Sequence, residues 1–257
     1  MSSVTGRIKQ IKQPYGGYIS PSRFEETCLN DGLTLNTEEN IHASLIGMAV
    51  DYMSRKYAGE GDDDAFNISF AGAEMADILG KKDSMLTAWN LYMGIRGLDD
   101  DSIINACKLV TLDVWYRNTM AAMMTNTTYK DVMPNKATIE NIRILINRSL
   151  KFFETYGDPV CSGFTFDPVK GGDRAREKWA KSGKGNYGGY TVTVDTGDGD
   201  FLTEDTLWDF KVSKSKPTSS NTLQLLMYWI MGQHSGQEIF KNITKLGIFN
   251  ITWSCAT

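Results

Sequence analysis

The spacing of apolar residues divides the chain into a helical part and a later part rich in short strands. Before residue 158 apolar side chains recur at helical spacing, and after it short β-type runs alternate with glycine-containing turns. We expect helices at residues 37–57, 71–80, 83–95, 101–123, 137–156 and 219–231. We expect strands at residues 160–166, 190–194, 201–202, 206–212 and 244–250. This order predicts an α/β fold, a small mixed β-sheet flanked by helices.

The length of the chain fits one large domain. Its 257 residues are 41% hydrophobic and 23% charged, which excludes a disordered chain or a fibre. We expect a single domain over residues 1–257, with a mainly helical N-terminal part at 1–157 and a β-rich part at 158–257.

The sequence predicts a cytoplasmic protein that does not enter a membrane. Its long apolar stretches, such as residues 223–231, are too short for a span, and the N-terminus lacks the apolar segment of a secretory signal. The four cysteines show no CxxC spacing, so we expect free thiols. With a net charge of −4, binding to nucleic acid would require a local basic patch or bound cations.

Candidate chemistry gathers in the hairpin of residues 197–214. Asp200 follows a glycine-rich bend, and Asp209 and Lys211 share one face of the return strand while Phe210 packs into the core. The hairpin turns Asp200 back towards that edge, so two carboxylates and one ammonium converge. Such carboxylates can hold Mg²⁺, and a neighbouring lysine can orient a nucleophile. A surface ion pair would show the same Asp-x-Lys triplet.

The helix after this hairpin carries two polar residues among apolar ones. Gln224 and Tyr228 are four residues apart and therefore share one helical face. A buried glutamine satisfied by backbone groups is the alternative interpretation.

These elements together resemble the PD-(D/E)XK nuclease superfamily, specifically its RecB-like and lambda-exonuclease-like branch. The resemblance lies in Gly197 to Asp200, in Asp209-Phe210-Lys211 and in Gln224-Leu225-Leu226-Met227-Tyr228. It implies a restriction-endonuclease-like core and a metal-dependent DNA nuclease, more specifically an exonuclease. It also implies that Asp200 and Asp209 bind Mg²⁺ or Mn²⁺, that Lys211 assists the attacking water, and that the helix with Gln224 and Tyr228 lies along the DNA.

The resemblance also implies an upstream metal ligand. The RecB-like branch has a glycine, three residues and then a histidine, and here Gly47 is followed in that frame by Asp51. Asp51 is thus a third candidate metal ligand, although an ordinary pair with Arg55 would fit the same spacing. Glu39 is the alternative acid.

A basic segment precedes the hairpin. Residues 170–184 hold six basic and two acidic side chains, which could follow a phosphate backbone. The candidate DNA-binding residues are Arg174, Arg176, Lys178, Lys181, Lys184 and Lys214. A solvated loop would have the same composition.

The cysteine trio of the branch's iron–sulfur members is absent, so we expect no iron–sulfur cluster. Two other departures from the branch favour a different function. The chain stops soon after residue 250, where such relatives continue, and Asp51 stands at the position of the branch's histidine. The alternative is therefore an inactive nuclease fold that binds DNA or protein as an inhibitor or accessory subunit. The expected partner is DNA, single- or double-stranded. A second copy of the chain or a nuclease-complex subunit is also compatible with the sequence.

Overall fold

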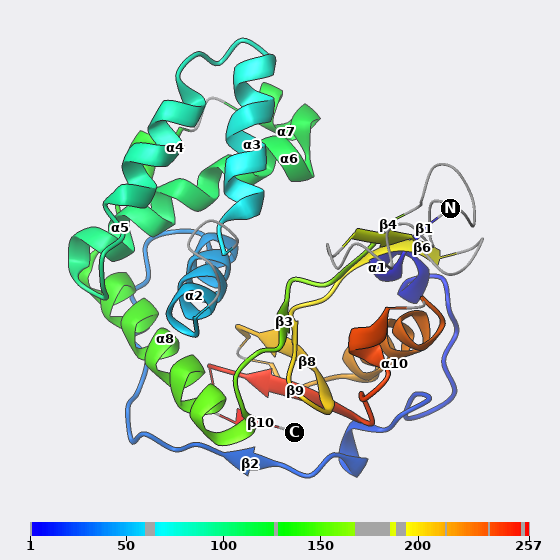
Figure 1. Cartoon of the computed structure of the whole chain (residues 1–257). Coiled ribbons are helices and arrows are strands. Elements are labelled where there is room, and N and C mark those ends of the chain that lie inside the picture. Colours follow the sequence, from blue (N-terminus) through cyan, green and yellow to red (C-terminus); the bar gives the residue numbers. More distant parts are fainter. Residues whose placement is uncertain are drawn as a thin grey trace. The chain divides into compact units, whose positions relative to one another are not determined.

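The computed structural model describes residues 2–59, 65–125, 128–167, 186–188, 194–213, 215–235, 237–252 and 255–256. It has a mixed α/β fold with two compact units (Figure 1). The helical unit is Asp31–Lys151, and the β-rich unit combines Met1–Asn30 with Phe152–Thr257. The change expected near residue 158 thus lies close to a boundary between units, whereas residues 1–30 belong to the β-rich unit and not to a helical N-terminal part.

The helical unit takes its structure from amphipathic segments of the kind that the sequence predicts. Its helices are α2 (Ala43–Tyr57), α3 (Asn67–Ile78), α4 (Ser84–Met93), α5 (Asp100–Leu109), α6 (Asp113–Arg117), α7 (Thr119–Met124) and the greater part of α8 (Lys136–Tyr156). Within the described ranges, no helix combines the length and the apolar character needed to cross a membrane.

Helix α2 begins at Ala43, so the start predicted at residue 37 was wrong. The polar residues before it bind the first turns of α8 instead. The Asn36 amide donates to Asn141 Oδ1 at 2.7 Å, and the Asn40 amide donates to Thr138 Oγ1 at 3.0 Å. Side chains that look like helix caps in the sequence therefore connect two segments far apart in the chain.

The single helix predicted at residues 101–123 is divided into α5, α6 and α7. Asn118 has an extended φ of −154° and caps α7, because its Oδ1 accepts from the Ala121 amide at 3.1 Å. Nearby, the buried Asp113 carboxylate accepts from Tyr52 Oη and from Ser69 Oγ, each at 2.6 Å. Arg117 Nε also lies 3.5 Å from Asp113 Oδ2. The buried Asp113 carboxylate thus has hydrogen-bond partners for both oxygens and has a structural role in the helical core.

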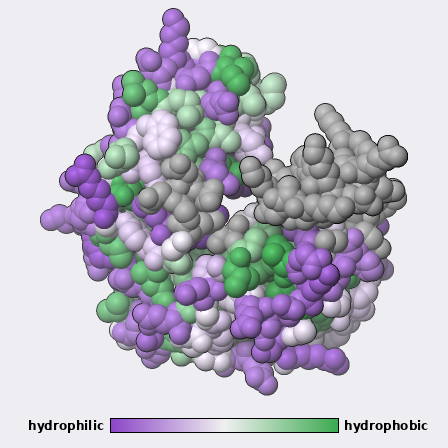
Figure 2. Space-filling view, in the orientation of Figure 1, coloured by the Kyte–Doolittle hydropathy of each residue, from purple (hydrophilic) through white to green (hydrophobic). Residues whose placement is uncertain are grey.

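Apolar side chains also reach the surface of the helical unit (Figure 2). Exposed ones lie in or near α3, α4 and α7 and include Ile78, Leu86, Met93, Met120 and Met124. Isolated apolar side chains at a surface are ordinary in folded proteins.

The described residues of the β-rich unit form two sheets. The six-stranded sheet has the order β2 (Thr27–Cys28), β10 (Cys255–Ala256), β9 (Lys245–Asn250), β8 (Thr206–Lys211), β7 (Phe201–Leu202) and β3 (Cys161–Ser162). The four-stranded sheet has the order β1 (Ser2–Ser3), β6 (Val194–Asp198), β4 (Thr165–Asp167) and β5 (Asn186–Gly188). The helices of this unit include α1 (Val4–Ile8) and α10 (Ser219–His234).

The hairpin on which the candidate site depends is confirmed. Strands β7 and β8 are antiparallel, with Phe201 opposite Trp208, and the Thr203 amide donates to the Thr206 carbonyl at 3.0 Å across the turn. Strand β8 then pairs in parallel with β9, with Asp209 opposite Ile248. The central sheet is therefore mixed, as predicted.

One expectation about the cysteines was wrong. Cys28 is disulfide-bonded, and Cys255 is the residue directly opposite it in the antiparallel pair of β2 and β10. Cys107 and Cys161 remain thiols, as expected. The short strands that bring residues 28 and 255 together are only two residues long, and sequence spacing alone offered no signal for them.

Strand β8 separates two environments because its side chains alternate between the faces of the sheet. Leu207 belongs to the apolar core that includes Leu225 of α10, and Asp209 and Lys211 share that face. Trp208 and Phe210 lie on the opposite face. There Phe152 of α8 contacts Trp208 at a ring distance of 4.7 Å and stacks on Phe249 at 4.2 Å. Phe210, which is partly buried, contacts Phe249 as well, at a ring distance of 5.6 Å.

We expect Phe152→Ala to destabilise the β-rich unit strongly. The Phe152 ring is completely buried, and its removal leaves a cavity beneath β8 and β9, which costs about 3–5 kcal/mol of unfolding free energy. Ile230→Ala is a matched control on the same unit, because Ile230 is 38% exposed and should lose about 1 kcal/mol. Urea unfolding followed by tryptophan fluorescence measures both, and equal losses would contradict this account of the core.

Candidate functional site

Asp200 lies where the chain turns from the four-stranded sheet into β7. Its carboxylate is held by the neighbouring strand, because Oδ2 accepts from the Phe210 amide at 2.6 Å. Its carbonyl accepts from the Gly163 amide at 2.7 Å. Phe201 and Trp208 are the last pair of the β7–β8 ladder, and Asp200 and Asp209 are the residues that follow this pair on the two sides of the hairpin.

Asp209 and Lys211 form an ion pair inside the β-rich unit. Lys211 Nζ donates to Asp209 Oδ1 at 2.8 Å, with the Asp209 side chain only 3% exposed and that of Lys211 27% exposed. The same-face placement predicted from the strand period is confirmed. This pair is largely removed from solvent, unlike the surface ion pair that the sequence left open.

Burial and charge act together on the protonation of this pair. Burial is the main cause that raises the pKa of Asp209, while the Lys211 ammonium opposes that rise. For Lys211, burial lowers the pKa, but the charges of Asp209 and Asp200 outweigh it and raise the pKa above its ordinary value. The lysine is therefore a stable cation at neutral pH, held between two carboxylates.

The second oxygen of Asp209 distinguishes this cluster from a structural ion pair. Within the described part of the chain, Asp209 Oδ2 is buried and has no hydrogen-bond partner. An unsatisfied buried polar atom is destabilising, so its presence indicates a missing ligand or a functional constraint. A carboxylate oxygen of this kind suits a hard divalent cation.

The donor set allows a cation that keeps much of its water. Among the described residues there is no group of three or more His, Cys, Asp and Glu side chains arranged for a metal ion. Asp200 and Asp209 provide two carboxylates, and Mg²⁺ commonly binds through one or two carboxylates and several waters. The two acids therefore fit Mg²⁺ or Mn²⁺ better than they fit a cation that requires a full protein cage.

Gln224 and Tyr228 form a polar pair on α10. Gln224 Nε2 donates to Tyr228 Oη at 3.1 Å, which confirms that they share a helical face. The Tyr228 ring is buried and packs against β6, where a Cβ added to Gly197 would lie 2.9 Å from the ring carbon Cε1. Gly197 of the motif is thus the residue that lets the α10 tyrosine approach the strand leading to Asp200.

The two candidate upstream acids both lie in the helical unit. Asp51 Oδ2 pairs with Arg55 Nη2 at 3.1 Å, which is the i,i+4 pair that the sequence offered as the alternative to metal binding. Glu39 Oε1 accepts from Asn141 Nδ2 at 2.7 Å. Each acid therefore has a partner within its own unit, and a metal-binding role for Asp51 stays a prediction.

The predicted basic segment lies outside the described residues. The six candidate DNA-binding residues, which include Lys214 after the hairpin, are therefore not described: Arg174, Arg176, Lys178, Lys181, Lys184 and Lys214. Their contact with DNA also stays a prediction.

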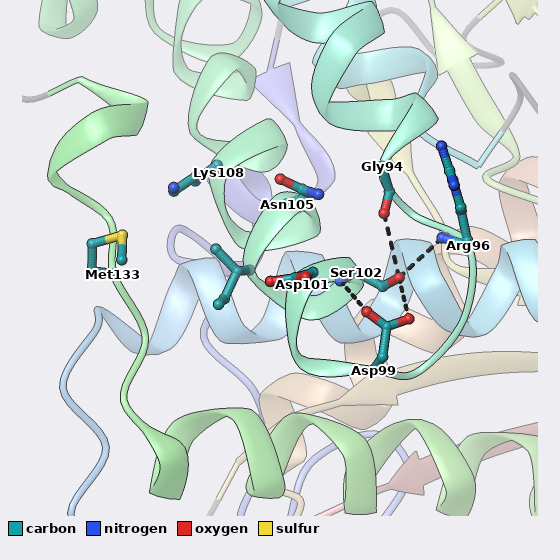
Figure 3. Close-up of a pocket in the computed structure, with 9 residues that line it drawn as sticks. Gly94, Arg96, Asp99, Asp101, Ser102, Asn105, Lys108 and Met133 are labelled. Atoms are coloured by element: carbon teal, nitrogen blue, oxygen red, sulfur yellow. Dashed lines mark hydrogen bonds between the residues drawn. The ribbon is translucent and has the colours of Figure 1, made fainter.

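The helical unit contains a pocket of about 570 Å³ at the start of α5 (Figure 3). Its polar wall is a helix cap. Ser102 Oγ donates to Asp99 Oδ2 at 2.7 Å and accepts from the Arg96 amide at 3.0 Å, and Asp99 Oδ1 accepts from the Ser102 amide. These groups satisfy one another, so the wall has a structural role and lacks the unsatisfied atom found at Asp209.

Sequence reasoning missed Asn250, which supports the site from β9. Asn250 is the register partner of Lys211 in the parallel pair of β8 and β9. Its Nδ2 donates to the Ser215 carbonyl at 3.2 Å and so fixes the connection between Lys211 and α10. A buried polar residue at the end of an otherwise apolar strand is the signal that could have identified it.

Comparison with known proteins gives no relative from which to transfer a function. No family model, no curated protein and no solved structure matches this chain.

The raised pKa of Asp209 predicts a pH-dependent effect of Asp209→Asn. In the unfolded chain the Asp209 carboxyl loses its proton near pH 3.8, whereas in the folded state it keeps the proton to a higher pH. The contribution of Asp209 to stability therefore falls as pH rises. In EDTA, the Tm of Asp209→Asn relative to that of wild type should therefore rise as pH increases from 4 to 7.5.

The control for this prediction is Asp205→Asn at the other end of β8. Lys245 lowers the pKa of Asp205, so its contribution is present at neutral pH and is lost as pH falls below its ordinary range. The Tm differences of the two variants from wild type should therefore change with pH in opposite directions. A loss of Tm in Asp209→Asn that is independent of pH would contradict the assignment of a destabilising buried charge.

Proposed function

We propose that this chain is a metal-dependent nuclease that hydrolyses DNA phosphodiesters and has a restriction-endonuclease-like core. The observation that carries the proposal is the buried Asp209 carboxylate, which has one oxygen on Lys211 and the other without a partner among the described residues. Asp200 flanks the same end of the β7–β8 ladder. The order of these residues, followed by the Gln224–Tyr228 pair, supports the RecB-like and lambda-exonuclease-like branch and hence an exonuclease.

Each group in the cluster has a chemical task in such a reaction. Asp200 and Asp209 would hold Mg²⁺ or Mn²⁺. When bound, the cation would supply Lewis-acid stabilisation of the charge that builds on the phosphate. The Lys211 ammonium, fixed by Asp209, would orient the attacking water and offset negative charge next to the phosphate. Gln224 and Tyr228 would position the strand.

Lys211→Ala should reduce cleavage of end-labelled linear DNA in Mn²⁺ on the order of 10²–10³-fold, because it removes the only cation that the described residues place on Asp209. The matched control is Lys245→Ala. Lys245, at the start of β9, pairs at 2.6 Å with Asp205 in the turn before β8, at the end of these strands remote from Lys211. Lys245→Ala should therefore keep full activity.

Two outcomes of this assay would contradict the proposal, the first its mechanism and the second the enzyme itself. Equal activity of Lys211→Ala and wild type, with both folded, would remove Lys211 from the reaction. No cleavage by wild type in any divalent metal, with DNA binding retained, would favour the alternative of an inactive nuclease fold that serves as a binding module.

Metal binding can be tested without cleavage. A ligand that binds only the folded state at 100 times its Kd adds about 2.7 kcal/mol of stability, so saturating Mn²⁺ should raise the wild-type Tm by several degrees. Asp209→Asn should lose most of this rise, while Asp205→Asn should keep it. A rise of the same size in Asp209→Asn would show that Mn²⁺ binds elsewhere.

A further inference from the structure

Two stretches of the β-rich unit contain no acidic residue at all. About one residue in eight of the chain is acidic, yet residues 1–24 and 210–237 contain neither Asp nor Glu. The first stretch carries Arg7, Lys9, Lys12 and Arg23, and the second carries Lys211, Lys214 and Lys216. An overall acidic protein thus concentrates positive charge in these two segments, where, among the described residues, Lys211 alone has been shown to pair with an acid, Asp209.

The fold brings these two stretches together on α10. Helix α1 packs against α10, and both belong to the β-rich unit (Figure 1). Thr222 Oγ1 donates to the Ile19 carbonyl at 2.6 Å. A Cβ added to Gly17 would lie 2.6 Å from the Ser219 Cβ, so only glycine allows this close approach. The N-terminal segment is therefore fixed to the first turns of α10.

Two tyrosines project from this fixed segment. Pro14 to Gly17 form a β-turn in which the Gly17 amide donates to the Pro14 carbonyl at 2.9 Å and Gly16 has a φ of +82°. Tyr15 is at the corner of this turn with a relative exposure of 108%, and Tyr18 is 56% exposed. The side chains of Lys12 and Arg23, on either side of them in the chain, are also exposed.

The start of α10 is also connected along the chain to the candidate site. Strand β8 ends at Lys211 and α10 begins at Ser219, and Asn250 fixes the connection between them through the Ser215 carbonyl. The exposed Lys216 is part of this connection. The connection that carries Lys216 and the segment that presents Tyr15 therefore both meet the start of α10.

We propose that residues 9–23, together with Lys216, bind single-stranded nucleic acid. Lys9, Lys12, Arg23 and Lys216 would contact phosphates, and bases would stack on Tyr15 and Tyr18. A single strand fits better than a duplex, because only unpaired bases offer free faces to an exposed ring. This inference rests on the proposed function, whose substrate it specifies as a single-stranded region next to Lys211.

Binding of fluorescein-labelled oligothymidylate in EDTA, followed by anisotropy, tests this surface without cleavage. The double variant Tyr15→Ala with Tyr18→Ala should raise Kd on the order of 10-fold or more, because the bases can no longer stack on the two rings. The double variant with Phe at both positions should bind as wild type does, because the rings remain. Tyr116→Ala, a 56% exposed tyrosine of the helical unit, is the matched control and should not change Kd.

The salt dependence of Kd tests the proposed contacts between basic side chains and phosphates. Lys12→Ala with Arg23→Ala should make the dependence of log Kd on log salt shallower by about 0.7 for each phosphate that the protein no longer neutralises. Lys82→Ala, an exposed lysine of the helical unit, should leave that slope unchanged.

The outcomes separate this inference from the proposed function. Absence of oligothymidylate binding, unchanged Kd in the double Ala variant, or equal affinity for the duplex with oligodeoxyadenylate would overturn the inference, even if wild type cleaves DNA in Mn²⁺. Tyrosine-dependent binding without cleavage in any divalent metal would support the binding surface and overturn the nuclease.

Discussion

The double burial of strand β8 is the constraint on which the β-rich unit depends. β8 pairs with β7 on one edge and with β9 on the other, and four of its six residues, Thr206 to Asp209, are buried. Because its side chains alternate, every second residue must suit the aromatic layer beneath α8, and the others must suit the face towards α10. A shift of one residue would exchange Trp208 with Asp209 and place a carboxylate among aromatic rings. The register is thereby fixed, and with it the positions of Asp209 and Lys211.

That constraint also explains why the polar cluster is tolerated. Burial of a carboxylate and an ammonium is unfavourable unless the two pair well, and only one oxygen of Asp209 has such a partner among the described residues. The packing of Phe152, Trp208 and Phe249 on the other face supplies the stability that the cluster reduces. Proteins break local rules of polar satisfaction mainly at functional sites. The cluster is therefore better explained by chemistry than by stability.

The sequence predicted the parts of the fold that follow from short-range periodicity. The β7–β8 hairpin, the shared face of Asp209 and Lys211, and the i,i+4 pair of Gln224 with Tyr228 all depend on residues a few positions apart. The failures depend on distant partners. Helix α2 starts late because Asn36 and Asn40 bind α8, about a hundred residues away. The disulfide of Cys28 depends on strands too short for any periodic signal.

Net charge is a poor guide to what such a chain binds. A net charge of −4 suggests repulsion of nucleic acid, yet screening in physiological salt limits the reach of a charge to about 8 Å. A ligand at the N-terminal turn therefore responds mainly to charges within that distance, and the two stretches that meet there contain no acid. The acids elsewhere weaken non-specific binding of nucleic acid. Local composition, once the fold shows which segments are neighbours, thus decides the electrostatics of a surface, and Tyr15 and Tyr18 lie where that local balance is positive.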